Sequence, residues 1–271
     1  MDAKAGFVLG ALALWLGAMP LHAAEPLVIG GTGSAIGVVR KLAEAYQDTD
    51  TTQTVEVLTS LGTSGGLRAL ADGQIDIALV SRALTPQERE GLHVAVLART
   101  PLAFVANQEV TASGLSTDAL IAFYRSTRTR WPDGAHARPV LRPWHDAETQ
   151  VLAAWSEPMA DALSAASYRT DLLVTLTTQE NLKAIEQTPG AFGYAPLAEV
   201  VVSEPALRVL TFEGVAPTPA GLAAGRYPLA MTLAMVTGPA SAGKAQALID
   251  FVRSPTGTGI LTAAGCLPLS P

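Results

Sequence analysis

Twice within the first 70 residues, an apolar segment runs into a short stretch of glycine and hydroxyl residues and then into a helical pattern. The clearer case is 55–70, where valines alternate with polar neighbours and leucines then recur at helical spacing. Between them lies Gly62-Thr63-Ser64-Gly65-Gly66. Backbone N–H groups at a helix start attract anions, and small side chains let a ligand approach the backbone. The stretch therefore predicts an anion-binding loop ahead of a helix.

The other case begins at Leu27-Val28-Ile29, passes through Gly31-Thr32-Gly33-Ser34 and continues into a helical pattern. A dinucleotide-binding fingerprint fits poorly, because the third glycine falls at Gly37, one position late. Strand and helix patterns alternate along most of the chain. This alternation favours an α/β fold with parallel sheets.

The first 24 residues have the features of a secretory signal peptide. Lys4 precedes an apolar core at 6–16, and Leu21-His22-Ala23-Ala24 supplies small residues for cleavage. The apolar run is short for a membrane span, so cleavage is favoured over an anchor, and no membrane insertion is expected afterwards.

Composition excludes several classes of function. The net charge of −6 argues against nucleic acid as a partner. Cys266 is the only cysteine, so an internal disulfide is excluded, and we expect this residue to be a small buried apolar group. The histidines are scattered and one cysteine cannot build a thiolate site, so neither a metal nor another cofactor is expected. Secretion without disulfides is compatible with a bacterial periplasm.

Four segments resemble, in order and spacing, the substrate-binding proteins of phosphate ABC transporters. They are 31–34, 61–66, 76–82 and 190–194. The resemblance implies the two-lobed type II periplasmic binding protein fold, an α/β fold in which each lobe is a mostly parallel sheet flanked by helices. A two-strand hinge would join the lobes. Lobe 1 would comprise 25–105 and 225–271, and lobe 2 would comprise 106–224.

The same resemblance implies a monomeric periplasmic protein without enzymatic activity. It would capture a small oxyanion, phosphate-like, or an anionic metabolite in the cleft and close around it. Its membrane partner would be an ABC transporter permease. A sensory or assembly module that contacts a membrane protein through the same lobes is the alternative.

The family's ligand contacts map onto several positions of this chain. The first lobe supplies most of them, and position 82, often an aspartate in phosphate binders, is an arginine here. The residues implied are Thr32, Gly33, Ser34, Thr63, Ser64, Gly65, Ser81, Arg82, Arg142, Asp146 and Thr149.

Two carboxylates stand where the family usually has Ser-Gly-Thr, four residues after Arg142. These are Asp146 and Glu148. A carboxylate about 4 Å from a bound anion repels it by a few kcal/mol at an intermediate effective dielectric. Asp146 could cap its helix, since acids complement the helix dipole there. It could instead accept a hydrogen bond from a protonated oxyanion, or the ligand could carry a cationic or hydroxyl-rich part.

The two arginines at strand ends have two interpretations. Arg82 and Arg142 could bind a carboxylate or phosphate bidentately. They could also form ion pairs with Asp76, Asp146 or Glu148 across the cleft. The position after a strand favours contact with a ligand.

A serine hydrolase is a third, less favoured function. Residues 62–66 fit the nucleophile-elbow pattern G-x-S-x-G around Ser64. A triad would also need a later acid and one of His93, His136 or His145, and no oxyanion loop of the His-Gly-Gly type precedes Ser64. Binding without chemistry is therefore the main prediction.

Overall fold

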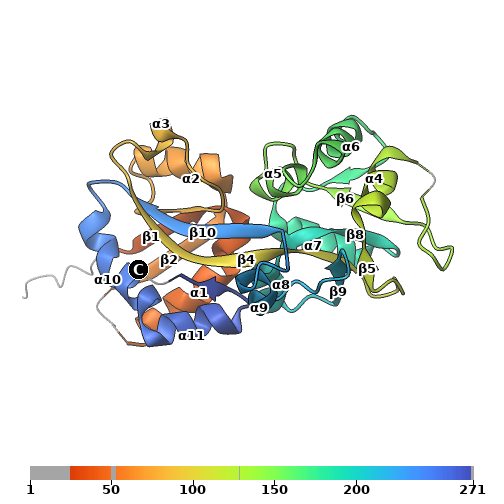
Figure 1. Ribbon diagram of the computed structural model, residues 1–271. Helices are drawn as coiled ribbons and strands as arrows, with labels where there is room; N and C mark the ends of the chain where they lie inside the picture. Colours follow the sequence, from red (N-terminus) through yellow and green to blue (C-terminus); the bar gives the residue numbers. More distant parts are fainter. Residues whose placement is uncertain (1–24, 50–52, 128, 270–271) are drawn as a thin grey trace, which may run out of the picture.

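A computed structural model describes residues 25–49, 53–127 and 129–269. The predicted signal peptide at 1–24 lies outside these ranges. Within them, no helix combines the length and apolar character that crossing a membrane requires. The described elements form two groups of strands and helices (Figure 1). The first half is built around the strands at 27–31, 55–60, 77–80 and 230–237, and the second half around those at 138–141, 173–174, 191–196 and 207–212. One long strand, at 93–107, takes part in both.

The first half is built on a mixed sheet. Its strands lie in the order β2 (Val55–Ser60), β1 (Leu27–Gly31), β3 (Ile77–Val80) and β10 (Ala230–Thr237). β1 pairs in parallel with β2 and β3, whereas β10 runs antiparallel to β3. Parallel neighbours need a crossover connection, which α1 (Gly33–Gln47) and α2 (Gly62–Ala71) supply.

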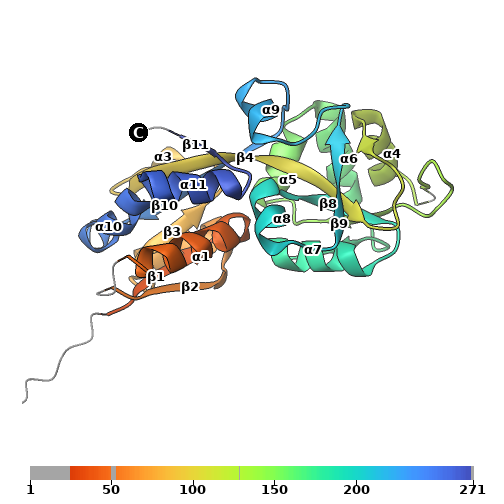
Figure 2. The same cartoon turned by 90° about the horizontal axis from the view of Figure 1, so that it is seen from below.

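Helices cover both faces of this sheet. On one face α1 packs with α10 (Ala242–Arg253) and α11 (Pro255–Ala263) in a shared apolar core, and these three helices lie side by side in Figure 2. On the other face, Leu70 of α2 packs with Val80 and Val236 of the sheet. The predicted buried position of Cys266 is confirmed, because it lies in the first of these cores with 1% of its surface exposed.

Strand β4 (His93–Asn107) joins the two halves. Residues 93–101 pair antiparallel with β10, and residues 102–107 pair antiparallel with β8 (Ala191–Pro196) and β9 (Leu207–Phe212). In both views β4 runs without interruption from one group of helices to the other (Figures 1 and 2).

The second half repeats the α/β arrangement. β8 pairs in parallel with β6 (Arg138–Leu141), which pairs in parallel with β7 (Leu173–Val174). Buried aromatic rings hold this half together, among them Phe104, Phe192 and Trp131. The elements that complete the second half are β5 (Gly114–Leu115), α4 (Thr117–Arg125), α5 (Ala147–Ala153), α6 (Glu157–Ser167) and α7 (Thr178–Gln187).

Four short elements remain among the described residues. α8 (Leu197–Ser203) packs on α1, where Ala198 enters the apolar core of the first half. The other three are α3 (Pro86–Arg89), α9 (Pro219–Ala223) and β11 (Leu267–Pro268).

The predicted α/β class is confirmed, with one local correction to the helix starts. α1 begins at Gly33 and α2 at Gly62, so Ser34 and Thr63–Gly65 lie in first helical turns and not in loops ahead of them. Gly31 (φ 131°), at the end of β1, and Gly62 (φ 69°), the first residue of α2, adopt backbone conformations that favour glycine, so the turn into each helix is short.

Candidate binding cleft

A cavity of about 490 Å³ lies between the two halves. Its volume falls within the range of about 300–1,000 Å³ that is usual for small-molecule sites. The starts of four helices, α1, α2, α5 and α7, border it. Its lining comprises Thr32, Gly33, Ser60, Leu61, Gly62, Thr63, Ser64, Gly65, Arg68, Arg82, Arg142, Pro143, His145, Asp146, Ala147, Leu176, Thr177 and Glu180.

Side chains of the protein cap three of these four helix starts. Thr32 accepts from the backbone N–H of Ser34 at α1, and Asp146 accepts from that of Glu148 at α5. Thr177 and Glu180 form a reciprocal capping box at α7. These backbone donors are satisfied within the protein and contribute little to a ligand site.

The start of α2 differs from the other three. Its N-cap residue is Leu61, which has no polar side chain to accept from the helix, and no side chain in the described ranges accepts from the N–H groups of Thr63 or Ser64. The Thr63 hydroxyl oxygen is buried and has no hydrogen-bond partner among the described residues. Unsatisfied donors and a positive dipole end make this helix start the strongest anion-attracting feature of the cleft.

Two arginines, Arg82 after β3 and Arg68 in the last turn of α2, line the same cavity. Arg82 donates to both carboxylate oxygens of Glu88, at 2.7 and 2.8 Å, and to the Ser64 hydroxyl at 3.4 Å. The hydrogen bonds from Arg82 lower the pKa of Glu88 to about 2. The partner of Arg82 is thus Glu88, and not Asp76, Asp146 or Glu148; Asp76 pairs with Lys244 instead. Arg68, which is exposed, has no ion-pair partner in the described part of the chain.

Arg142 lies at the centre of a buried cluster. It forms ion pairs with Asp146 and, through Nε at 3.1 Å, with Glu148, while Nη1 donates to the Thr175 carbonyl at 2.9 Å. Of the two interpretations that the sequence left open for this arginine, the ion pair is the one the structure contains. Both anticipated carboxylates take part, so one cation offsets two negative groups.

Glu148 lies behind the cavity wall and is fully buried. Its Oε1 accepts from the hydroxyls of Ser34 (2.9 Å) and Thr178 (2.8 Å). Burial, followed by the charge of Asp146, raises the pKa of Glu148 to about 7. A hydroxyl of the first half and two donors of the second half therefore converge on one carboxylate.

Eight of the eleven residues implied by the resemblance line the cavity; Ser34, Ser81 and Thr149 do not. Ser34 donates to Glu148, Ser81 shares a hydrogen bond with Thr32 (3.0 Å), and Thr149 shares one with the Tyr194 hydroxyl (2.8 Å). These three hydroxyls position the cleft walls. Arg68, in the last turn of α2, and Glu180, in the first turn of α7, line the cavity without having been predicted as ligand contacts.

A second buried glutamate, Glu199, links α8 to the cleft. It accepts from the Gly37 backbone N–H (2.8 Å) and from Gln179 (3.0 Å), which also donates to the Gly33 carbonyl (3.1 Å). Burial raises the pKa of Glu199 to about 7. Two carboxyl groups near the cleft are therefore protonated in the folded protein at a pH where an unfolded chain has lost those protons.

Stability should consequently fall as pH rises. Unfolded glutamates titrate near 4.5 and these two near 7, so the folded state binds more protons between those values. We expect the free energy of unfolding to decrease between pH 5 and pH 8 by on the order of 1–3 kcal/mol per group. Urea unfolding at four pH values measures this. The double variant E148Q/E199Q should flatten the profile, and a wild-type stability that rises with pH would contradict the assignment.

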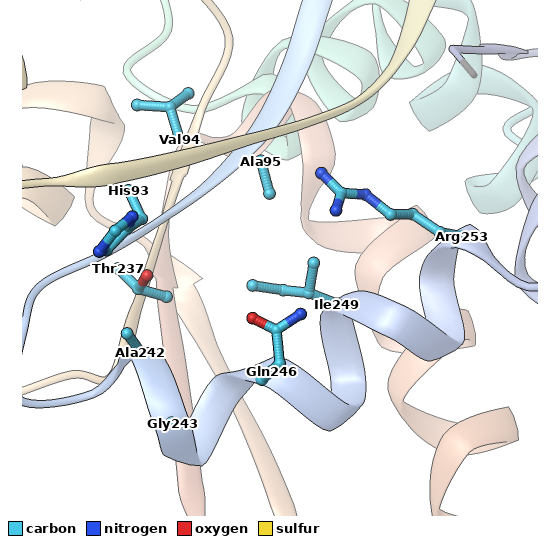
Figure 3. Close-up of a pocket in the computed structure, with 9 residues that line it drawn as sticks. All are labelled: His93, Val94, Ala95, Thr237, Ala242, Gly243, Gln246, Ile249 and Arg253. Atoms are coloured by element: carbon cyan, nitrogen blue, oxygen red, sulfur yellow. The ribbon is translucent and has the colours of Figure 1, made fainter. Parts of the chain in front are cut away.

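A separate cavity of about 430 Å³ lies within the first half (Figure 3). Its polar side chains include His93 of β4 and Gln246 and Arg253 of α10. All its walls belong to one half, so no second half can close over it. The described residues also contain no group of histidine, cysteine and acidic side chains suited to a metal ion.

The environment of Ser64 does not suit a nucleophile. The side chain that contacts its hydroxyl is the guanidinium of Arg82, which has no lone pair to accept a proton. A general base within hydrogen-bond reach is what an activated serine requires. This position therefore fits a ligand contact better than a catalytic centre.

Comparison with known proteins agrees with this architecture. The phosphate-binding protein PstS 2 of Streptococcus pneumoniae is 34% identical over 110 residues, which are 41% of this chain and 38% of that protein. A Clostridium perfringens protein solved with bound phosphate superposes with a TM-score of 0.76 at 18% identity, covering 90% of this chain and all of that one. An ABC-type phosphate transport receptor from Vibrio cholerae gives 0.64 at 21% identity, covering 89% and 99%.

The alignment with the curated relative thus spans well under half of either chain, and the two solved structures show a shared fold. A family model described as the PBP superfamily domain matches residues 20–256. Because this match covers most of the sequence, the chain belongs to the PBP superfamily domain family.

Proposed function

We propose that this protein is an extracytoplasmic solute-binding protein that captures a small oxyanion or anionic metabolite between its two halves. The uncapped start of α2 is the observation that carries this proposal. The N–H groups of Thr63 and Ser64, the unpartnered Thr63 hydroxyl and the Arg68 guanidinium in the cavity wall all favour a negative ligand, and Arg82 adds a cation that Glu88 partly offsets. The relatives compared above, one a phosphate-binding protein and one solved with bound phosphate, support the same class of ligand.

The two halves would act as lobes that close over the ligand, with the segment around β4 as the hinge. Closure would present a changed surface to an ABC transporter permease in the membrane, and the protein would act as a periplasmic monomer after removal of its signal peptide. It would carry out no chemical step.

A carboxylate placed at the start of α2 tests this assignment. The variant S64D adds an acid at the third helical position, where it complements the dipole and should leave stability unchanged or raise it by about 0.3–1 kcal/mol. The same carboxylate would repel a bound anion by about 4 kcal/mol at an effective dielectric of 20, so affinity should fall at least 100-fold. Calorimetry with orthophosphate, sulfate and succinate measures the change.

A matched control is available at α10. G243D also adds an acid to a first turn that no side chain caps, but Gly243 borders the cavity of Figure 3 and not the cleft. Its affinity should equal that of the wild type. If S64D bound the same anions as tightly as G243D, the start of α2 would not be the ligand site.

A further inference from the structure

The donors that converge between the two halves are already used by the protein itself. Ser34 at the start of α1, Thr178 at the start of α7 and Arg142 after β6 all donate to the Glu148 carboxylate. Hydroxyls at helix starts and a guanidinium are groups suited to holding a small oxyanion in a cleft. The carboxylate therefore takes the place that such an anion would take.

The contact between Ser34 and Glu148 crosses from one half to the other. It joins residues 114 positions apart, and the bond from Gln179 to the Gly33 carbonyl lies beside it. A bound anion bridging the halves would make the same kind of link. Glu148 consequently accepts the hydrogen bonds that a bound anion could accept. Through Ser34 it also links the two halves, as a bound anion would.

The charge around this carboxylate is unfavourable for an anion. The titratable groups that face it are Arg142 after β6, Asp146 at the N-cap of α5, Tyr194 on β8 and Glu199 on α8. When Asp146 and Glu148 are both ionised, they outweigh the one guanidinium. An anion entering the cleft therefore meets a net negative wall opposite the positive start of α2.

We propose that Glu148 is a built-in competitor of the ligand and the specificity-determining residue of the cleft. It disfavours a fully ionised oxyanion beside Arg142 and confines strong anion binding to the α2 side of the cavity. Removing its charge, by substitution or by protonation, releases the Arg142 side to the ligand. This inference rests on the proposed function of anion capture, and it identifies the residue that limits the affinity of the cleft for anions.

The test compares wild type, E148Q and E213Q by titration calorimetry with orthophosphate at pH 8. E148Q preserves the shape of the side chain, and E213Q removes a second-half carboxylate that accepts from Thr117 and does not line the cavity. We expect E148Q to bind orthophosphate at least tenfold more tightly than wild type, and E213Q to match wild type. E148A serves as a second variant, with the same expected direction, and circular dichroism verifies that each variant is folded.

The pH dependence of anion binding is measured with sulfate, because sulfate stays dianionic from pH 5.5 to pH 8. Wild-type affinity for sulfate should strengthen more on acidification than that of E148Q, because E148Q lacks the carboxylate whose protonation frees the donors of Arg142 and Ser34. Equal affinities and equal pH dependence in wild type and E148Q would overturn the proposal, as would undetectable orthophosphate binding by folded E148Q and E148A. If wild type and E148Q behaved alike, loss of anion binding in S64D would still support the proposed function of anion capture. Failure of the role of Glu148 is therefore distinguishable from failure of the proposed function.

Discussion

Replacement of Arg142 by methionine should lower the free energy of unfolding by about 3–5 kcal/mol at pH 8. The side chain of Arg142 is 3% exposed and lies between Asp146 and the fully buried Glu148. Methionine fills a similar volume but leaves two carboxylates without their cation. Desolvated charge of this kind is among the most destabilising features that a substitution can create. Denaturant unfolding monitored by tryptophan fluorescence measures the loss.

Two comparisons make this result specific. In R142M/E148Q the uncompensated buried charge is gone, so much of the lost stability should return. R82M removes the other cleft ion pair, whose partners are each 28% exposed, and should cost about 0–1 kcal/mol. Equal losses of unfolding free energy in R142M and R82M would contradict the prediction, because they would mean that burial of Asp146 and Glu148 does not increase the cost of removing their cation.

The second large effect is expected at Gly31, at the end of β1. A Cβ atom there would lie 2.3 Å from the Leu79 carbonyl oxygen, and the backbone has a φ of 131°. The obstruction is backbone of the paired strand β3 and cannot rotate away. G31A should therefore lose on the order of 3 kcal/mol or more, from steric overlap and from backbone strain together.

The neighbouring glycine is the control for this substitution. The atoms nearest to a Cβ at Gly30 belong to the side chains of Leu61 and Ile75, the closest at 3.0 Å, and these can shift. G30A should cost less than about 1 kcal/mol in the same thermal and urea measurements. Comparable losses in the two variants would mean that the strands separate easily at this point.

Local features of the cleft could be predicted from the sequence because short-range chemistry determines them. The capping box at Thr177 and Glu180 and the cap at Asp146 each involve residues within three positions of one another. The same holds for the glycine and hydroxyl stretches that begin α1 and α2. The order of the motifs then indicated the family, which in turn implied the arrangement of the halves.

Long-range pairing could not be predicted in the same way. The bond from Ser34 to Glu148 joins residues 114 positions apart, and only the completed fold brings them together. Glu148 reads in sequence as an ordinary first-turn acid, which it also is. The partner of Arg82 was missed because Glu88 lies in a short helix, α3, whose position relative to the strand end depends on the turn between them.

The position of β10 has a consequence for how the chain folds. This strand lies between β3 and β4, so the sheet of the first half is assembled from segments about 150 residues apart in sequence. The paired strands of the second half come from one uninterrupted stretch, starting late in β4. During synthesis the second half can therefore pair its strands before the first half does. The first half cannot complete its sheet until β10 has been synthesised.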